Sequence, residues 1–483
     1  MFVCWLFLFG LDVNVAYPDE GRERLQGDAI TASPAPRPNR FGPSTLVEVG
    51  GQVLLFDAGR GVPIRMGQIG VPLGKIDVLF LTHFHSDHVS GIPDVWRSLE
   101  SPNHSATPYQ RFDSLAAWQR RVGQRAGLSP FLVIARDDDG RPLGLLPLVS
   151  RTAFGVRSAS FMGGTHSTFN MGLWQREVAA TATEHDLQSL TAMLSARDEA
   201  DVLVLRRQPT YWRDLQNPLR LLPHEPSTVH CPVRTIEPGA TTVTLISESL
   251  RRRLQRKERK LQSLAGYRYY IASDDVDISR LLDWFFQVKP QRMAQQKLPS
   301  VFADPGVQEF IRSACMTKLA DGGRAIEIHA LECDEEVIAI FAGVADDHRF
   351  STMFNTYTMS RKAKFSPGLI LMRYVIDHFA SQSYRAFDFG IGLYDYKLLV
   401  CPDYEPIFDS FIPLSVRGRF AVGAISAVNE AKRFVKSNPA LLDIAHGPSR
   451  QLVRCSGLSG VGGKADLSST HACAPMFRRW RGG

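Results

Sequence analysis

Four side chains that can bind metal lie close together after a short apolar segment, residues 75–81, which predicts a buried strand. They are His83, His85, Asp87 and His88. A strand end directs the first two toward one metal ion, and the following turn directs the others toward a second, about 3.5–4 Å away in two-metal hydrolases. The spacing therefore predicts a zinc site, and zinc-dependent hydrolysis, for the front of the chain.

A different chemistry is predicted near Ser366. Ser366 is typical of a helix N-cap, Pro367 suits the first helical position, and Gly368 lets a ligand approach the backbone. Unsatisfied N–H groups and the positive end of the helix dipole coincide there, which favours a phosphate. We therefore expect the phosphates of acetyl-CoA or another acyl-CoA to contact Arg361, Lys362, Lys364, Ser366, Gly368 and Leu369.

Candidate catalytic residues follow the strand predicted at 387–389. Attack on a thioester needs a polarised carbonyl and a proton for the leaving thiolate. Asp388 and Tyr396 flank the loop after the strand and are the best candidates for proton transfer; Lys397 either pairs with Asp388 or contacts an anionic substrate. Structural roles, a core tyrosine and a buried ion pair, remain open for all three.

Composition and charge indicate the compartment of the protein and exclude some classes of partner. The chain has 483 residues, a net charge of +7 and seven scattered cysteines without a CxxC pair, which favours a reducing, cytoplasmic location. Residues 1–11 are apolar but lack a basic segment before them, and no other apolar run reaches the length of a membrane span. The basic helix predicted at 247–264 has no interleaved aromatic residues, so we expect no nucleic-acid partner; its charges form either a solvated face or a contact with an anionic ligand.

The elements that position the predicted acyl-CoA site occur in an order that is found twice. A hairpin, 131–135 and 143–149, precedes a helix at 184–196 and a strand at 201–205. A second hairpin, 325–331 and 337–344, is followed by a strand at 350–358, a helix at 367–379 and the strand at 387–389. The repeated order predicts two similar α/β units packed side by side. His166 and Asn170, in a glycine-rich stretch, either line a substrate cleft between these units or serve turn chemistry.

The front of the chain resembles the metallo-β-lactamase superfamily, and its ribonuclease Z-like branch in particular. The residues that carry the resemblance are RFGPSTLVEVGGQVLLFDAGRG at 40–61 and LTHFHSDHVSGIPDVW at 81–96. It implies that His83, His85, Asp87 and His88 bind two zinc ions. A further His, a bridging Asp and a last His that the family needs are not found downstream, so the zinc site is incomplete. We interpret this segment as a natural fusion, a remnant or a misjoined reading frame.

Residues 108–445 resemble the GNAT-superfamily acyltransferases of the CelD-like group of cellulose biosynthesis, which are related in architecture to FemAB-type tandem transferases. The resemblance lies in PYQRFDSLAAWQRRVG at 108–123, FMGGTHSTFNMGLW at 161–174, FSPGLILMRYVIDH at 365–378 and FDFGIGLYDYKLLV at 387–400. It implies acyl transfer from acyl-CoA to an amine or hydroxyl of a small-molecule or saccharide acceptor. The phosphate loop departs from the usual GNAT pattern because it has a single glycine.

The predicted fold class is α/β: tandem GNAT-like units preceded by an incomplete metallo-β-lactamase-like fragment. The expected segments are an apolar and loop segment at 1–26, the fragment at 27–99, a linker at 100–107, a first unit at 108–240, a second unit with the acyl-CoA site at 241–445, and a disordered tail at 446–483. The predicted function is acyl transfer. Two alternatives stay open, a zinc-dependent hydrolase and a non-catalytic module of a polysaccharide-synthesis complex.

Overall fold

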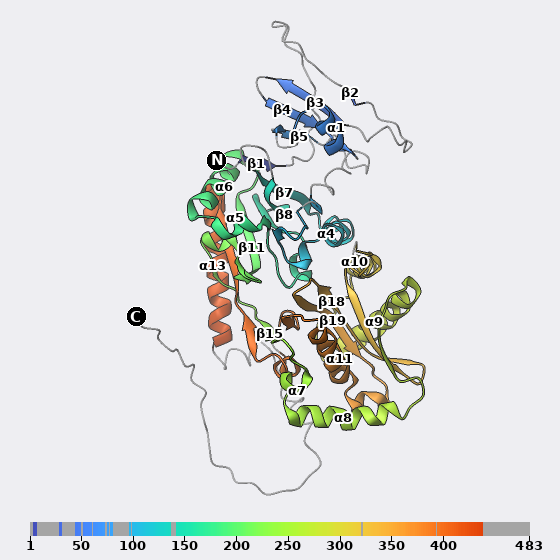
Figure 1. Ribbon diagram of the computed structural model, residues 1–483. Coiled ribbons are helices and arrows are strands. Elements are labelled where there is room, and N and C mark those ends of the chain that lie inside the picture. Colours follow the sequence, from blue (N-terminus) through green and yellow to red (C-terminus); the bar gives the residue numbers. More distant parts are fainter. Residues whose placement is uncertain are drawn as a thin grey trace. The chain divides into compact units, whose positions relative to one another are not determined.

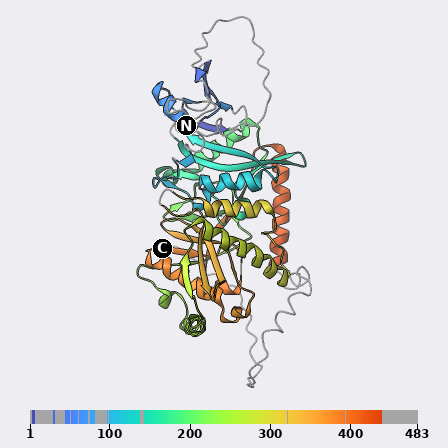
Figure 2. The ribbon, with the colours of Figure 1, turned by 90° about the vertical axis from the view of Figure 1, so that its right-hand side faces the viewer.

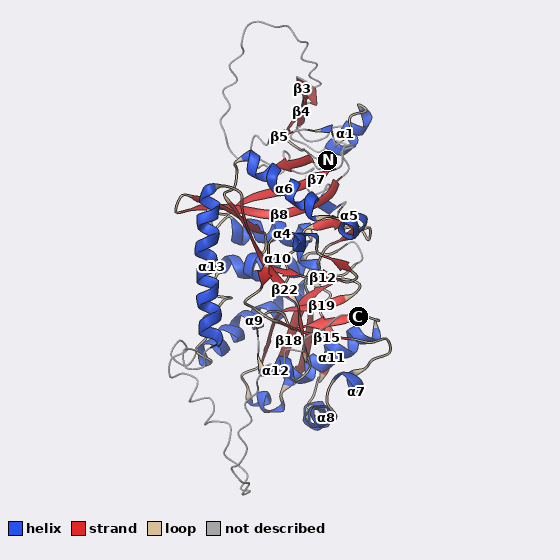
Figure 3. Ribbon diagram, turned by 90° about the vertical axis from the view of Figure 1, so that its left-hand side faces the viewer, coloured by secondary structure: helices blue, strands red, loops and turns tan. Residues whose placement is uncertain are grey.

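The computed structural model describes residues 3–6, 29–30, 44–49, 52–59, 61–72, 75–76, 78–80, 96–97, 99–136, 142–319, 322–392 and 394–437. The chain divides into two units, Met1–Asn429 and Glu430–Gly483. The first unit contains two large sheets, whose strands are red in Figure 3. Within the ranges given above, no helix is both long enough and apolar enough to cross a bilayer.

The first large sheet has nine strands, in the order β1-β7-β8-β9-β11-β22-β14, with β10 paired to β8 and β6 paired to β10. Its strands are β1 (Val3–Leu6), β6 (His104–Ser105), β7 (Ser129–Arg136), β8 (Pro142–Ala153), β9 (Val156–Phe161), β10 (Leu173–Gln175), β11 (Val202–Pro209), β14 (Glu225–Pro226) and β22 (Ile407–Pro413). The helices near it in sequence are α4 (Phe112–Trp118), α5 (Arg176–Thr181), α6 (Glu184–Arg197) and α13 (Val416–Ser437). The hairpin β7–β8 and helix α6 confirm the elements predicted there.

The second large sheet has seven strands, in the order β16-β17-β18-β19-β20-β15-β21. They are β15 (Cys231–Thr235), β16 (Arg268–Ile271), β17 (Glu327–Cys333), β18 (Glu336–Ala345), β19 (Arg349–Tyr357), β20 (Ala386–Asp388) and β21 (Asp403–Glu405). Its helices are α8 (Glu248–Gln262), α9 (Asp275–Gln295), α10 (Pro305–Met316) and α11 (Pro367–Ser381). Helices α4 and α10, cyan and yellow in Figure 2, pack against each other.

Helices cover both faces of this second sheet. Alternate residues of a strand point to opposite faces, so each strand contributes side chains to an apolar cluster on either side. In β18, Ile340 and Ala342 belong to the apolar cluster that includes α9 and α10. Ala339 and Phe341 belong instead to the cluster that includes α8 and α11. Both α9 and α11 contact β18 and β19 (Figure 1).

In both large sheets the strands and helices follow the same order along the chain. One late strand of each half of the chain, however, pairs in the sheet formed by the other half. In the first, an antiparallel series β7-β8-β9 is followed by helix and by β11, which is parallel to β9. In the second, β17-β18-β19 is followed by α11 and by β20, which is parallel to β19. Strand β22, late in the chain, pairs with β11, and β15, which precedes the whole second series, pairs with β20. Two strands therefore cross the division that the sequence predicts at residue 240.

The front of the chain forms a separate four-stranded sheet in the order β2-β3-β4-β5, with helix α1 (Val62–Gln68) after β4. Its strands are β2 (Ala29–Ile30), β3 (Ser44–Val49), β4 (Gln52–Phe56) and β5 (Val78–Phe80). Strands β3 and β4 pair antiparallel, from Thr45 with Phe56 to Val49 with Gln52. Together with the two large sheets, this arrangement confirms the α/β fold class.

The remaining elements are short: β12 (Tyr211–Trp212), β13 (Leu215–Gln216), α7 (Thr242–Leu245), α12 (Asp395–Leu398), and the single turns η2 (Pro108–Gln110), η3 (Gln119–Gly123), η4 (Gly164–His166), η5 (Pro218–Leu221) and η6 (Arg361–Phe365). Helix α4 ends at Trp118, and the chain continues directly as the π-helical turn η3. Asp304 caps the start of α10, because its carboxylate accepts the Gly306 N–H at 2.7 Å.

Candidate active site

The site lies where the parallel strands β19 and β20 separate. Their pairing ends at Ser351 and Asp388, but β19 continues to Tyr357. Beyond that point one edge of β19 has no strand neighbour among the described residues. The Asn355 carbonyl accepts a hydrogen bond from Lys289 Nζ at 3.0 Å on helix α9. Because the N–H and C=O of a strand residue face the same neighbour, the Asn355 N–H also faces this open edge.

The loop after β20 approaches β19 closely, and Gly390 makes the approach possible. Gly390 has φ 67°, and a Cβ there would lie 2.7 Å from the Thr352 carbonyl oxygen. Asp388 Oδ1 accepts the Gly390 N–H at 2.8 Å, and Lys397 Nζ donates to the carbonyls of Gly390 and Ile391, each at 3.0 Å. These contacts fix the course of the loop from both of its ends.

Asp388 is fully buried and belongs to a charged cluster. Its Oδ2 accepts from Arg349 Nε at 2.8 Å and from Ser351 Oγ at 2.5 Å. Arg349 also pairs with Glu405 at 2.6 Å. Lys397, the partner that the sequence suggested for Asp388, donates instead to the backbone carbonyls of the loop. Asp388 thus holds the end of β20, and it lines neither of the two cavities described next.

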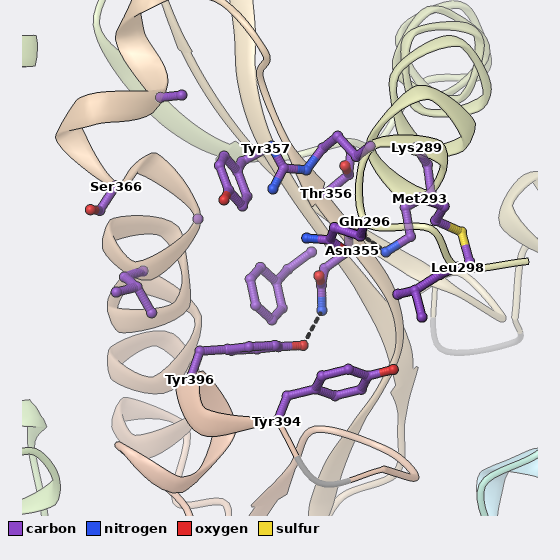
Figure 4. Close-up of a pocket in the computed structure, with 15 residues that line it drawn as sticks. Lys289, Met293, Gln296, Leu298, Asn355, Thr356, Tyr357, Ser366, Tyr394 and Tyr396 are labelled. Carbon is purple, nitrogen blue, oxygen red and sulfur yellow. Dashed lines mark hydrogen bonds between the residues drawn. The ribbon is translucent and has the colours of Figure 1, made fainter. Parts of the chain in front are cut away.

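Tyr396 is presented to the open edge by the loop that Asp388 and Lys397 hold. Asn355 Nδ2 donates to Tyr396 Oη at 3.5 Å, the dashed line in Figure 4. Tyr394 lies beside it, with ring centroids 6.1 Å apart. Burial raises the pKa of the Tyr396 hydroxyl, so this group keeps its proton at neutral pH.

Two cavities meet at this point. We call the first the α11-side cavity; it has a volume of about 380 Å³ and reaches the start of α11 at Ser366, Gly368 and Leu369. We call the second the α10-side cavity; it has a volume of about 520 Å³ and reaches Thr165 to Thr168 of the first sheet's connections and Phe310 of α10. Six residues line both cavities: Lys289, Met293, Leu298, Asn355, Tyr394 and Tyr396. Figure 4 shows Tyr394 and Tyr396 on one side of Asn355, with Lys289 and Met293 across from them.

The residues predicted to bind phosphate are only partly brought together. Ser366, Gly368 and Leu369 line the α11-side cavity, whereas Arg361, Lys362 and Lys364 do not. The Gly368 N–H has no acceptor in the part of the chain that the structure describes, as expected at the start of a helix. Lys362 is tied to Glu336 at 2.8 Å and to Asp334 at 3.3 Å, beside the turn of the β17–β18 hairpin.

Ser366 occupies the N-cap position of α11, directly before Pro367, as predicted, but its side chain does not cap the helix. The turn η6 runs directly into α11, so Ser366 adopts the left-handed conformation, φ 57°, at the junction, and its side chain makes no cap hydrogen bond. Its carbonyl accepts from the Leu369 and Ile370 N–H groups. Its hydroxyl accepts instead from Lys257 Nζ at 2.7 Å, which brings the basic helix α8 to the edge of the cavity.

The predicted zinc ligands His83, His85, Asp87 and His88 all lie outside the described residues. Within the described ranges, no group of three or more His, Cys, Asp or Glu side chains is arranged to hold a metal ion.

The α10-side cavity contains residues that the sequence did not single out. Lys289 is one lysine in an amphipathic helix, and no local motif distinguishes it from a solvated lysine. Burial lowers the pKa of Lys289 to about 8 and that of Lys397 to about 8. His166, one of the two residues left open by the glycine-rich stretch, lines this cavity, while the Asn170 amide donates to the Arg206 carbonyl and does not.

Family comparisons agree with this architecture. Residues 248–398 match the family described as acetyltransferase (GNAT) domain, and residues 37–156 match the metallo-beta-lactamase superfamily. The chain thus contains a GNAT-type acetyltransferase domain, which includes β19, β20, α11 and Tyr396, and a region of metallo-β-lactamase homology. The second match extends into β7 and β8, which belong to the nine-stranded sheet.

Individual relatives cover the front or the back of the chain. Ribonuclease Z of Mycobacterium avium is 50% identical over 82 residues, 16% of this chain and 29% of that protein, and ribonuclease Z of Mycobacterium marinum is 47% identical over 78 residues, 16% and 28%. The chain therefore spans less than a third of these relatives. The crystal structure of FemX is 9% identical, covers 64% of this chain and 97% of its own, and has a TM-score of 0.41. The structure of L-PGS from Bacillus licheniformis is 12% identical, with 62% and 90% covered and a TM-score of 0.38.

Proposed function

We propose that the protein transfers an acyl group from acyl-CoA to an amine or hydroxyl acceptor. The observation that carries the proposal is the meeting of two cavities at Tyr396 and Asn355, where β19 and β20 separate. The donor binds in the α11-side cavity, and the acceptor binds in the α10-side cavity. The match of residues 248–398 to the GNAT acetyltransferase domain supports this assignment.

The chain offers suitable groups for each step at the meeting point. The Asn355 N–H, facing the open edge of β19, donates to the acyl carbonyl and polarises it. The acceptor nitrogen or oxygen forms a bond to the carbonyl carbon as the carbon–sulfur bond breaks. Tyr396, which keeps its proton because burial raises its pKa, donates that proton to the leaving sulfur and regains one derived from the acceptor through solvent.

Other predicted residues take supporting roles in this proposal. Asp388 and Lys397 are positioning residues, because both hold the loop that carries Tyr396. Gly368 and the other residues at the start of α11 bind the phosphate groups of the donor, since an open N–H and the positive end of the helix dipole face the cavity. Sequence resemblance to the CelD-like group suggests a small-molecule or saccharide acceptor and a link to polysaccharide synthesis, in a cytoplasmic setting.

The test is release of free CoA thiol from acetyl-CoA in the presence of an acceptor panel. Tyr396→Phe is expected to lower kcat by about 100-fold or more, the usual contribution of a general acid, with the thermal midpoint unchanged. Tyr404→Phe is the matched control, because Tyr404 is an exposed tyrosine of β21 outside both cavities. An unchanged kcat in Tyr396→Phe, or no binding of any acyl-CoA to the parent protein, would refute the proposal.

A further inference from the structure

The lining of the α10-side cavity has an unusual charge balance. Three cationic side chains, Arg207, Lys289 and Lys397, line it, and its lining residues include no Asp or Glu. All three donate to backbone carbonyls: Lys289 to Asn355, Lys397 to Gly390 and Ile391, and Arg207 to Thr165 and Ser167 at 2.9 and 3.2 Å. No ion pair joins any of these three to a carboxylate within the described ranges.

The carboxylates that act on Lys397 and Arg207, Asp388 and Asp409, do not line the cavity and have other partners. Asp388 binds Arg349, and Asp409 accepts the backbone N–H of Arg207 at 2.9 Å. They raise the pKa values of Lys397 and Arg207, but burial has the larger effect and lowers both. For Lys289 the neighbouring charges are only cationic, those of Arg292 and Lys397. A partly buried cation without a counter-ion costs free energy, which a bound anion would offset.

The rest of the lining is divided between an apolar wall and polar groups. The apolar wall comes from α9, the segment that follows it, and α10: Met293, Leu298, Pro299, Val301, Phe302, Val307, Phe310 and Ile311. Thr352 lines the cavity from β19, is 2% exposed, and its hydroxyl has no hydrogen-bond partner among the described residues. This hydroxyl is a spare donor for a ligand. A neutral saccharide would find few acceptors for its own hydroxyl groups here, because the lining lacks carboxylates.

We propose that the α10-side cavity binds the acceptor through an anionic group, a carboxylate or a phosphate, and that the same acceptor carries an apolar portion. The anionic group contacts Lys289 and its cationic neighbours, and the apolar portion packs on the wall formed by α9 and α10. The inference rests on the proposed acyl transfer and names the class of its acceptor.

The test measures binding by calorimetry without any acyl-CoA, so that its result is independent of acyl transfer. The probes are N-acetylphenylalanine and its amide, which have the same shape and differ in charge. We expect the carboxylate to bind at least tenfold more tightly than the amide. Phenyl phosphate against phenol distinguishes a phosphate from a carboxylate as the preferred anion, and N-acetylglucosamine represents a neutral saccharide.

Variants of Lys289 test whether its charge is responsible for the preference for the anion. Lys289→Met should remove the preference for the anion, and Lys289→Arg should retain it because the charge is kept. Lys297→Met is the matched control, since Lys297 is an exposed lysine near the end of α9 that lines neither cavity. Circular dichroism confirms that each variant is folded.

The pH dependence adds a second readout with a defined sign. The anion should bind more weakly as pH rises through about 8, because Lys289 and Lys397, whose pKa values burial lowers to about 8, lose their charge there. The other titratable or charged groups near Lys289 are His166, Arg207, Arg292, Tyr394 and Tyr396. Equal affinities within both probe pairs, or tighter binding of N-acetylglucosamine than of either anion, would overturn the proposal, even if acetyl-CoA is consumed.

Discussion

Replacing Asp388 by Asn separates a structural role of this carboxylate from a chemical one. Asparagine has nearly the same volume as aspartate, but its NH2 group cannot accept a hydrogen bond. This NH2 group would face a donor in either orientation, Arg349 Nε and Ser351 Oγ in one and the Gly390 N–H in the other. The Arg349 charge, which is 4% exposed, then has only Glu405 as a partner. Breaking a buried ion pair by removing one partner costs about 3–5 kcal/mol.

At about 1–1.5 °C per kcal/mol for a unit of more than 300 residues, this loss corresponds to a fall of roughly 5 °C in the thermal midpoint. The matched control is Asp283→Asn, which removes the partner of Arg312 from an ion pair in which the aspartate side chain is 65% exposed. The control should cost about 1 kcal/mol or less. The assay is thermal unfolding followed by circular dichroism.

Thiol release from acetyl-CoA, measured well below both midpoints, completes the experiment. If Asp388 only holds the loop, kcat should fall less than it does in Tyr396→Phe. A midpoint within about 2 °C of the parent, combined with a 100-fold loss of kcat, would refute the structural role and restore Asp388 as a catalytic residue.

Two further predictions concern the donor and the front of the chain. Gly368→Val should weaken acetyl-CoA binding at least tenfold by calorimetry, because even a Cβ would lie 3.2 Å from Tyr357 Cδ1 at the cavity. The control is Gly423→Val, at a helical position with open space around it. Equal affinities of Gly368→Val and the parent protein for acetyl-CoA would exclude this donor site. His83→Ala combined with His85→Ala should leave thiol release unchanged, because Tyr396 and both cavities are built from residues after 160. Slower thiol release with an unchanged thermal midpoint would show that the front segment takes part in acyl transfer.

The sequence predicted local elements well and long-range pairings poorly. The hairpins and α11 follow from periodicity and turn residues, which are local signals. Strand β22 has no comparable local signal for its partners, because it lies between β11 and β14, which precede it by about 200 positions in the chain. The role of Lys289 has no local signal either, because it depends on where α9 crosses β19.

At the candidate site, too, the sequence predicted local features but not long-range contacts. The motif FDFGIGLYDYK drew attention to Asp388, Tyr396 and Lys397, and the structure places them at the two ends of one loop, Asp388 at the end of β20 and the other two in α12. Their different burial and partners could not be predicted, because Arg349 precedes Asp388 by 39 positions and comes from another strand. Ser366 is at the N-cap position but its side chain does not cap α11, because capping rules assume that a helix begins in extended chain, whereas η6 precedes this one.

The exchange of strands has a consequence for synthesis on the ribosome. Arg207 of β11 and Asp409 of β22 are hydrogen-bonded across 202 positions of sequence. At about 5–20 residues per second, β11 emerges roughly 10–40 s before the strand that covers its edge. During that interval the nascent first sheet exposes unpaired backbone groups, the kind of edge that recruits other strands. A chain that terminates before β22 would therefore be prone to aggregation, although it contains every other strand of its first sheet.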